Sequence, residues 1–141
     1  MNEYRKLKNK YQEEYNALPM FFAFSEESFE QGMLELGLQP TDTDKICQTE
    51  IGMFYRKEDE PLFIETIQRF NNELQKAISE DETGDNFIYQ MFYTELINHE
   101  YAFTEDPEDA LTALNLTWEQ VQADPRLKHG FEKASSKIIP Y

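Results

Sequence analysis

The chain has 141 residues, with 28 acidic and 13 basic side chains and a formal net charge of −15. This is about the length of one domain, and 11 phenylalanines and 8 tyrosines supply a bulky apolar core. A body this acidic repels nucleic acid and anionic membrane surfaces, so the composition argues against direct binding of either.

The charge is unevenly distributed along the chain. The first ten residues carry four cations against one glutamate, which leaves −18 on the remaining 131 residues. One cysteine, Cys47, rules out an internal disulfide and fits a reducing compartment. The N-terminus lacks the apolar core of a signal peptide, and no run approaches the 18 or so apolar residues of a membrane span. We therefore expect a soluble, cytoplasmic protein.

The first predicted element is a helix over residues 2–18, followed by a short strand. Tyrosine and leucine recur at three- and four-residue spacing in this helix, at Tyr4, Leu7, Tyr11, Tyr15 and Leu18. The spacing is close to 3.5 residues, which would also suit a seam between two copies of the helix. Pro19 ends the helix, and the five apolar residues 20–24 predict a buried strand.

The second predicted helix runs from Ser25, which supplies a hydroxyl cap, to about Leu36. Gly37 stands where a left-handed residue is needed, and Leu38 and Met33 supply the apolar pair of a Schellman ending.

Residues 45–50 and 52–57 are β-prone and nearly adjacent, which predicts a hairpin with room for a bulge at Gly52. Together with residues 20–24 they can form a three-stranded antiparallel sheet.

Two long helices are predicted next. The first begins near Asp59 or Glu60, before Pro61, and carries a single apolar stripe to about Ile78. The second covers residues 86–103, with Asp85 as its cap, and is apolar nearly all round. A helix of this kind belongs in a core with neighbours on several sides, so we expect it at the centre of the molecule.

The C-terminal part contains three further helix starts. Pro107 opens a short helix that ends at Leu114, with Asn115 as its left-handed residue. Thr117 and Gln120 form a capping box. Asp124 and Pro125 begin the last helix, which has Leu127, Phe131, Ala134 and Ile138 on one face.

These elements predict one helix-dominated α+β domain spanning residues 1–141. It has about six helices around the central helix 86–103 and a small antiparallel sheet near 20–24, 45–50 and 52–57. The alternative is an all-α fold in which 20–24 and 45–57 are irregular.

The strongest candidates for chemistry are Glu95 and His99, four residues apart on one face of the central helix. They could supply two metal ligands, but a zinc or iron site needs three or four. Further ligands would have to come from His129, Cys47 or loop carboxylates. A hydrogen-bonded Glu–His pair that ties the core together is the preferred interpretation. No phosphate-binding glycine loop or nucleophile motif is present, so we predict no catalytic residue and no cofactor.

Carboxylates gather at or just before the helix starts. Helix dipoles and caps explain part of this placement but not the size of the excess. Carboxylates on a rigid scaffold can imitate a phosphate backbone and occupy the basic groove of a nucleic-acid-binding protein. The candidate partner-binding residues are Glu58, Asp59, Glu60, Glu80, Asp81, Glu82, Asp85, Glu105, Asp106, Glu108 and Asp109.

Three apolar signatures carry a resemblance to a known family: FFAFSEESFEQGMLELGL, FIYQMFYTELINHEYAFT and ALNLTWEQVQADPRLKHG. In these segments the chain resembles a family of short uncharacterised proteins carried by conjugative elements and phages of gut bacteria. The resemblance covers most of the chain and supplies no catalytic residues. It implies a mobile-element accessory protein, a context in which small acidic proteins often act against host defence.

The leading hypothesis is therefore a non-enzymatic acidic protein that inhibits a host nucleic-acid-binding or defence protein. One alternative is a metal-assisted enzyme that uses Glu95 and His99. The other is a self-associating structural protein. The partner's identity and the oligomeric state stay open.

Overall fold

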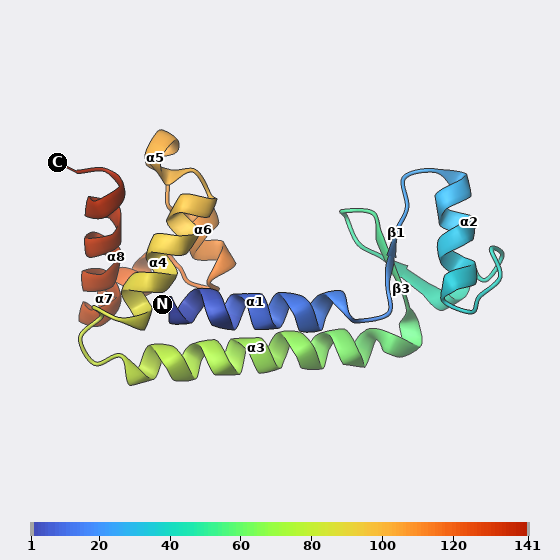
Figure 1. Ribbon diagram of the computed structural model, residues 1–141, viewed down its shortest axis with the longest axis horizontal. Coiled ribbons are helices and arrows are strands. Elements are labelled where there is room, and N and C mark those ends of the chain that lie inside the picture. Colours follow the sequence, from blue (N-terminus) through green and yellow to red (C-terminus); the bar gives the residue numbers. More distant parts are fainter. Residues whose placement is uncertain (1, 141) are drawn as a thin grey trace. The chain divides into compact units, whose positions relative to one another are not determined.

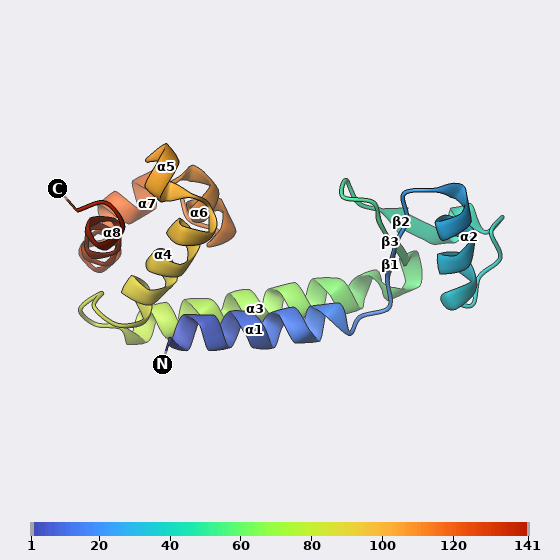
Figure 2. The same ribbon diagram turned by 45° about the horizontal axis from the view of Figure 1, so that its top comes forward.

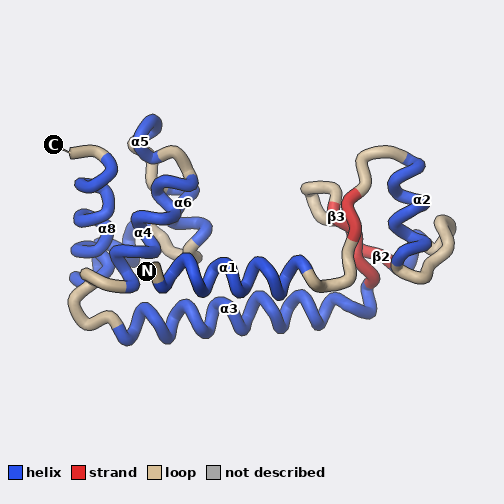
Figure 3. The backbone as a smooth tube through the Cα atoms, viewed as in Figure 1, coloured by secondary structure: helices blue, strands red, loops and turns tan. Residues whose placement is uncertain are grey.

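A computed structural model describes residues 2–140 and confirms a helix-dominated α+β fold (Figures 1 and 3). Eight α-helices, two 3-10 turns and three strands lie within these residues. In chain order they are α1 (Glu3–Asn16), β1 (Phe21–Phe22), α2 (Glu26–Glu35), η1 (Thr43–Lys45), β2 (Ile46–Gln48), β3 (Met53–Arg56), η2 (Lys57–Asp59), α3 (Glu60–Glu80), α4 (Phe87–Asn98), α5 (Tyr101–Thr104), α6 (Glu108–Ala113), α7 (Trp118–Ala123) and α8 (Pro125–Ile138).

The chain divides into two compact units. The helical unit consists of Met1–Lys10 and Asn71–Tyr141, and the sheet unit consists of Tyr11–Phe70. Helices α1 and α3 contribute residues to both units.

The sheet unit is built on the predicted three-stranded antiparallel sheet, in the order β1-β3-β2. Phe21 lies opposite Phe54 and Phe22 opposite Met53, and Cys47 lies opposite Tyr55. The strands are shorter than the apolar runs that predict them. The run 20–24 gives only two strand residues, Phe21 and Phe22, and the Phe24 amide donates to the Ser28 side chain near the start of α2.

Helix α2 covers one face of this sheet. Phe21 and Phe54 stack with ring centroids 5.1 Å apart, and buried Met33 packs with them. Gly32 permits this approach, because a Cβ atom there would lie 2.1 Å from the Phe21 ring. Both predicted ends of α2 are confirmed. Ser25 accepts the Ser28 amide in a capping box, and the Leu38 amide donates to the Met33 carbonyl beyond Gly37 at φ 77°.

The tyrosines of α1 are engaged within the units. In the sheet unit Tyr11 stacks on Phe70 and Tyr15 packs edge-on against Phe63. In the helical unit buried Tyr4 packs edge-on against Phe87. The tyrosines of the stripe that could have formed a seam between two copies of α1 therefore pack against other side chains of the same chain.

Helix α4 forms the core of the helical unit, where Ile88, Met91, Phe92 and Leu96 are fully buried. Helix α8 packs on it with Phe92 and Phe131 edge-on. The predicted burial of this helix is confirmed, but the prediction of a single helix over 86–103 is wrong. Glu100 adopts a left-handed conformation at φ 58°, so α4 ends at Asn98 and the short α5 begins at Tyr101 (Figure 2).

The remaining helix boundaries follow their predicted caps. Asn115 is left-handed at φ 57°, and the Leu116 amide donates to the Leu111 carbonyl. Thr117 and Gln120 form the capping box of α7, and Asp124 caps α8 before Pro125.

Candidate functional site

The carboxylates proposed to bind a partner fall into three clusters. The first cluster comprises Glu58, Asp59 and Glu60, and it lies in the sheet unit, in η2 and at the first residue of α3. Asp59 is buried and accepts a 2.6 Å hydrogen bond from Arg56, whose guanidinium also donates to the Leu36 carbonyl. Asp59 therefore stabilises the turn into α3 and is not a surface group. Glu58 and Glu60 are exposed.

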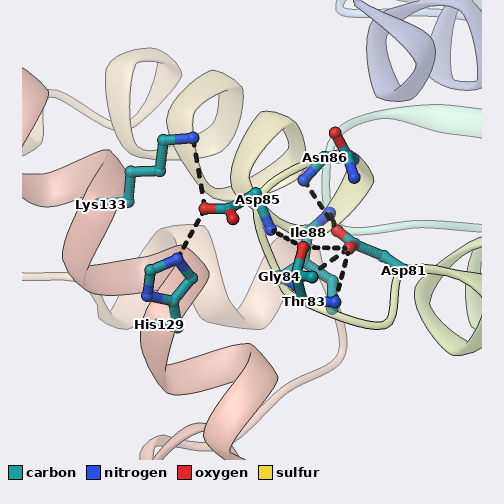
Figure 4. Close-up of polar contacts among 8 residues, drawn as sticks. All are labelled: Asp81, Thr83, Gly84, Asp85, Asn86, Ile88, His129 and Lys133. Carbon is teal, nitrogen blue, oxygen red and sulfur yellow. Dashed lines mark hydrogen bonds and ion pairs between the residues drawn. The ribbon is translucent and has the colours of Figure 1, made fainter.

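The second cluster comprises Glu80, Asp81, Glu82 and Asp85, in the helical unit between α3 and α4. Asp81 is only 5% exposed. Its carboxylate accepts the amides of Thr83, Gly84, Asn86 and Ile88, at 2.9–3.3 Å (Figure 4). Burial acts to raise the pKa of Asp81, but the amide donors outweigh it and lower that pKa below its ordinary value.

Asp81 also replaces Asp85 as the cap of α4. The prediction that Asp85 caps this helix is wrong, because the cap position is Asn86 and its side chain makes no capping bond. The amides of Asn86 and Ile88 donate to the buried carboxylate of Asp81, which precedes them by five and seven residues. An acidic residue this far from the helix start gives no capping pattern in the sequence.

Asp85 instead pairs with α8. Its Oδ1 lies 2.6 Å from His129 Nε2 and 3.4 Å from Lys133 Nζ (Figure 4). The His129 hydrogen bond, followed by Lys133, holds the pKa of Asp85 below its usual value. Of the second cluster, Glu80 and Glu82 are exposed, and neither has an ion pair within residues 2–140.

The third cluster comprises Glu105, Asp106, Glu108 and Asp109, in the helical unit between α5 and the first turn of α6. All four side chains are exposed, and none has an ion pair in the described part of the chain. Phe103, two residues before the cluster, is 89% exposed. Exposed Glu100 precedes it, and both Glu100 and Glu105 are left-handed, at φ 58° and 55°.

The second and third clusters lie at opposite ends of α4. The second precedes α4 and the third follows its far end, and 12 helical residues span about 18 Å at 1.5 Å per residue. The first cluster lies in the other unit.

Glu95 and His99 do meet, within a larger polar group at the core of the helical unit. Glu95 is completely buried; Lys8 donates to its Oε1, and His99 Nε2 lies 3.4 Å from its Oε2. Tyr4 is the fourth member. Burial, and then the neighbouring Glu95 carboxylate, raise the pKa of its hydroxyl. Tyr4 and Lys8 are four apart on α1, but nothing in their sequence indicates that they face Glu95.

This group has the character of a buried ion pair. Lys8 pairs with the carboxylate, although Glu95 Oε2 finds no hydrogen-bond partner of normal geometry within residues 2–140. His129, one of the possible further metal ligands, pairs with Asp85 before α4, whereas His99 lies at the opposite end of that helix. Within residues 2–140 no group of three or more histidine, cysteine, aspartate or glutamate side chains is placed to hold a metal ion.

Comparison with known proteins assigns the chain to a family of unknown function. A family model described as a family of unknown function, DUF7659, matches residues 3–137. Searches of curated proteins and of solved structures find no match to the chain. In the described residues no helix has the length and apolar character needed to cross a membrane.

Proposed function

From the premise that the chain belongs to the DUF7659 family of unknown function, we propose that it is a non-enzymatic binding protein that presents carboxylates to a basic protein. The proposed partner is a host nucleic-acid-binding or defence protein, and the proposed effect is inhibition. The proposed context is that of a mobile-element accessory, which rests on the resemblance described for the three apolar signatures.

The observation that carries this proposal is the exposed Phe103 among the carboxylates of the third cluster. Carboxylates alone are explained by solubility. A phenylalanine that is 89% exposed does not improve solubility, and aromatic side chains are enriched where proteins bind one another. Two left-handed glutamates hold the turn that carries it. Non-glycine residues adopt this conformation at a cost of about 1–2 kcal/mol, and such strain concentrates at binding sites.

The chemistry of the segment suits an arginine-rich surface. The carboxylates of the third cluster form no ion pair within residues 2–140, and each can accept charge-assisted hydrogen bonds from a guanidinium. The ring of Phe103 can carry a further cation over its face. A nucleic-acid-binding groove offers both kinds of contact, because it is lined with arginine and lysine that normally contact phosphate.

A charge-reversal experiment tests the proposal. The bait is the full chain, used at low and high salt to capture partners from a bacterial host lysate. Its test variant carries Glu105→Lys, Asp106→Lys and Glu108→Lys. The control carries Glu13→Lys, Glu119→Lys and Glu132→Lys, three exposed glutamates outside the three clusters whose reversal changes the net charge equally.

We expect the test variant to lose a captured basic protein that the control retains. Association should slow more than dissociation accelerates, because peripheral charges act mainly on encounter. Duplex DNA should compete with the chain for the partner. An unchanged association rate and salt dependence in the test variant would remove the third cluster from the proposal.

A further inference from the structure

The sheet unit exposes an apolar patch at the end of its sheet where β1 meets the β2–β3 hairpin. Phe24 is 82% exposed, Ile51 67% and Phe22 51%. The Ala23 amide donates to the Gly52 carbonyl, which continues the pairing of β1 with β3 and brings Phe24 beside the hairpin turn. The Phe24 ring lies over Gly52, where an added Cβ would come within 2.7 Å of it.

The patch is distinct from the apolar residues that hold the sheet unit together. Phe21 and Phe54 are buried under α2. Met53, opposite Phe22, is buried beside Tyr15. Phe22, Phe24 and Ile51 therefore add apolar surface beyond what the core of this unit uses. Exposed apolar side chains gathered at one end of a sheet are typical of interaction sites.

The rim of the patch is acidic. Glu50 precedes Ile51, and Glu26 and Glu27 follow Phe24 in the first turn of α2. All three are exposed, and none has an ion pair among residues 2–140. Glu27 also lines a shallow hollow of about 310 Å³ with Ser25, Ser28 and Gln31.

We propose that Phe22, Phe24 and Ile51 form a docking surface for a basic amphipathic segment of another protein. Apolar side chains of that segment cover the three residues, and its lysines or arginines pair with Glu26, Glu27 and Glu50. The surface lies in the sheet unit, so it is a second site, separate from the third cluster around Phe103.

Charge complementarity selects this occupant over the two obvious others. A second copy docked about a two-fold axis would place the acidic rim against the same rim, in a chain with a net charge of −15. An anionic membrane would meet the same repulsion at Glu26, Glu27 and Glu50. A basic amphipathic segment can cover the apolar patch with its apolar side chains and pair its cations with the acidic rim.

The probe is a fluorescein-labelled amphipathic peptide of lysine and leucine, compared with a lysine and serine peptide of the same length and charge. Binding to the full chain is followed by fluorescence anisotropy. We expect saturable binding of the leucine peptide and binding at least about tenfold weaker for the serine peptide. Equal binding of the two peptides, or no saturable binding of the leucine peptide, overturns the proposal.

Single substitutions then locate the site. Phe24→Ser should raise Kd about tenfold or more, as for a central anchor. Ile97→Ser, at an apolar side chain of the other unit that is 48% exposed, is the control and should change Kd by less than about twofold. An unchanged Kd in Phe24→Ser overturns this docking surface, and a loss of binding in Phe103→Ser instead would assign the peptide to the third cluster. Circular dichroism confirms that each variant remains folded.

Two further measurements test the rim and the occupant. Glu50→Lys should weaken binding of the leucine peptide more than Glu65→Lys, a change at an exposed glutamate of α3 that belongs to neither the patch nor its rim. Light scattering of the free chain should show no dimer that Phe24→Ser dissociates, and vesicles of anionic lipid should not bind. A dimer or vesicle binding that is lost in Phe24→Ser would overturn the proposal, because the surface would then bind a second copy of the chain or a membrane.

Discussion

Asp81 shows how a single buried carboxylate can organise a loop of this acidic chain. It accepts four backbone amides between the end of α3 and the first turn of α4. Arg126 closes the same loop from α8, since its guanidinium donates to the carbonyls of Ile78 and Asp81. Asp81 consequently acts as a structural residue, and reversal of its charge would test folding rather than partner binding.

Replacement of Asp81 by alanine should lower the free energy of unfolding at pH 7 by about 2–4 kcal/mol, because buried amides lose their acceptor. The folded pKa is lowered, so the carboxylate stabilises the protein above its unfolded pKa of about 3.9, and this stabilisation is lost as pH falls below that value. Denaturant titration should therefore show a difference between wild type and Asp81→Ala that shrinks below about pH 4. Glu82→Gln, at the exposed neighbour, is the control and should unfold like wild type. A difference independent of pH would contradict the role of the charge.

The Lys8–Glu95 pair gives a second prediction at this scale. Lys8→Met leaves a fully buried carboxylate without its cation, and breaking a buried pair in this way costs about 3–5 kcal/mol. The lower value is expected, because Lys8 is partly exposed. The double variant Lys8→Met, Glu95→Leu should recover much of the loss, since no buried charge remains. Chemical denaturation of the two single variants and the double variant measures the coupling. Additive losses would show that the two residues act independently.

At the scale of elements, the approach of α2 to the sheet depends on Gly32. Alanine favours a helix interior over glycine by about 1 kcal/mol, but here its Cβ would lie 2.1 Å from the buried Phe21 ring. Displacing that ring disturbs its stack with Phe54, and overpacking of this kind costs about 1–3 kcal/mol. We therefore expect Gly32→Ala to destabilise the protein.

Gly37→Ala is the matched control for Gly32→Ala. A Cβ there meets no atom within 4 Å, and its strain comes from φ 77° alone. Thermal unfolding should show a loss for both, whereas near-ultraviolet circular dichroism from the Phe21–Phe54 stack should change for Gly32→Ala alone. A stabilised Gly32→Ala variant would show that the ring moves freely.

The same elements show what local sequence can and cannot predict. Ser25, Gly37, Thr117 and Asp124 mark helix boundaries correctly, because caps and Schellman endings use residues within a few positions of the boundary. The break after Asn98 was missed, since Glu100 has no intrinsic preference for the left-handed conformation that it adopts. Likewise, Gly32 carries no local signal, because its role depends on a phenylalanine in a different element.

For the candidate sites, the sequence shows where carboxylates and aromatic residues occur, but not which of their side chains are exposed. It identified the carboxylate clusters but could not separate buried Asp59 and Asp81 from exposed Glu105 and Glu108. It also could not distinguish exposed Phe24 and Phe103 from core phenylalanines. Burial depends on which faces meet across distant elements, and spacing along the chain determines that only for long amphipathic helices.

At the scale of the whole molecule, the net charge of −15 makes salt act in opposite directions on folding and on binding. Exposed carboxylates that have no cationic partner among residues 2–140 occur in both units, at Glu26, Glu27 and Glu50 and in the third cluster. Their mutual repulsion opposes the compact state. Salt screens it, because the Debye length falls from about 10 Å at 0.1 M to about 3 Å at 1 M.

Sodium chloride should therefore raise the temperature midpoint of unfolding between about 0.05 and 0.5 M, a range over which screening grows strongly. Over the same range it should weaken association with any basic partner, because the charges that repel one another in the free protein are those that attract the partner. Calorimetry of the free chain and anisotropy with the lysine and leucine peptide measure the two effects on one sample. Sodium sulfate is an unsuitable substitute, since it also strengthens apolar burial. If added chloride lowered the midpoint, the favourable ion pairs of the fold, such as Arg56–Asp59 at 2.6 Å, would outweigh the repulsion among its unpaired carboxylates.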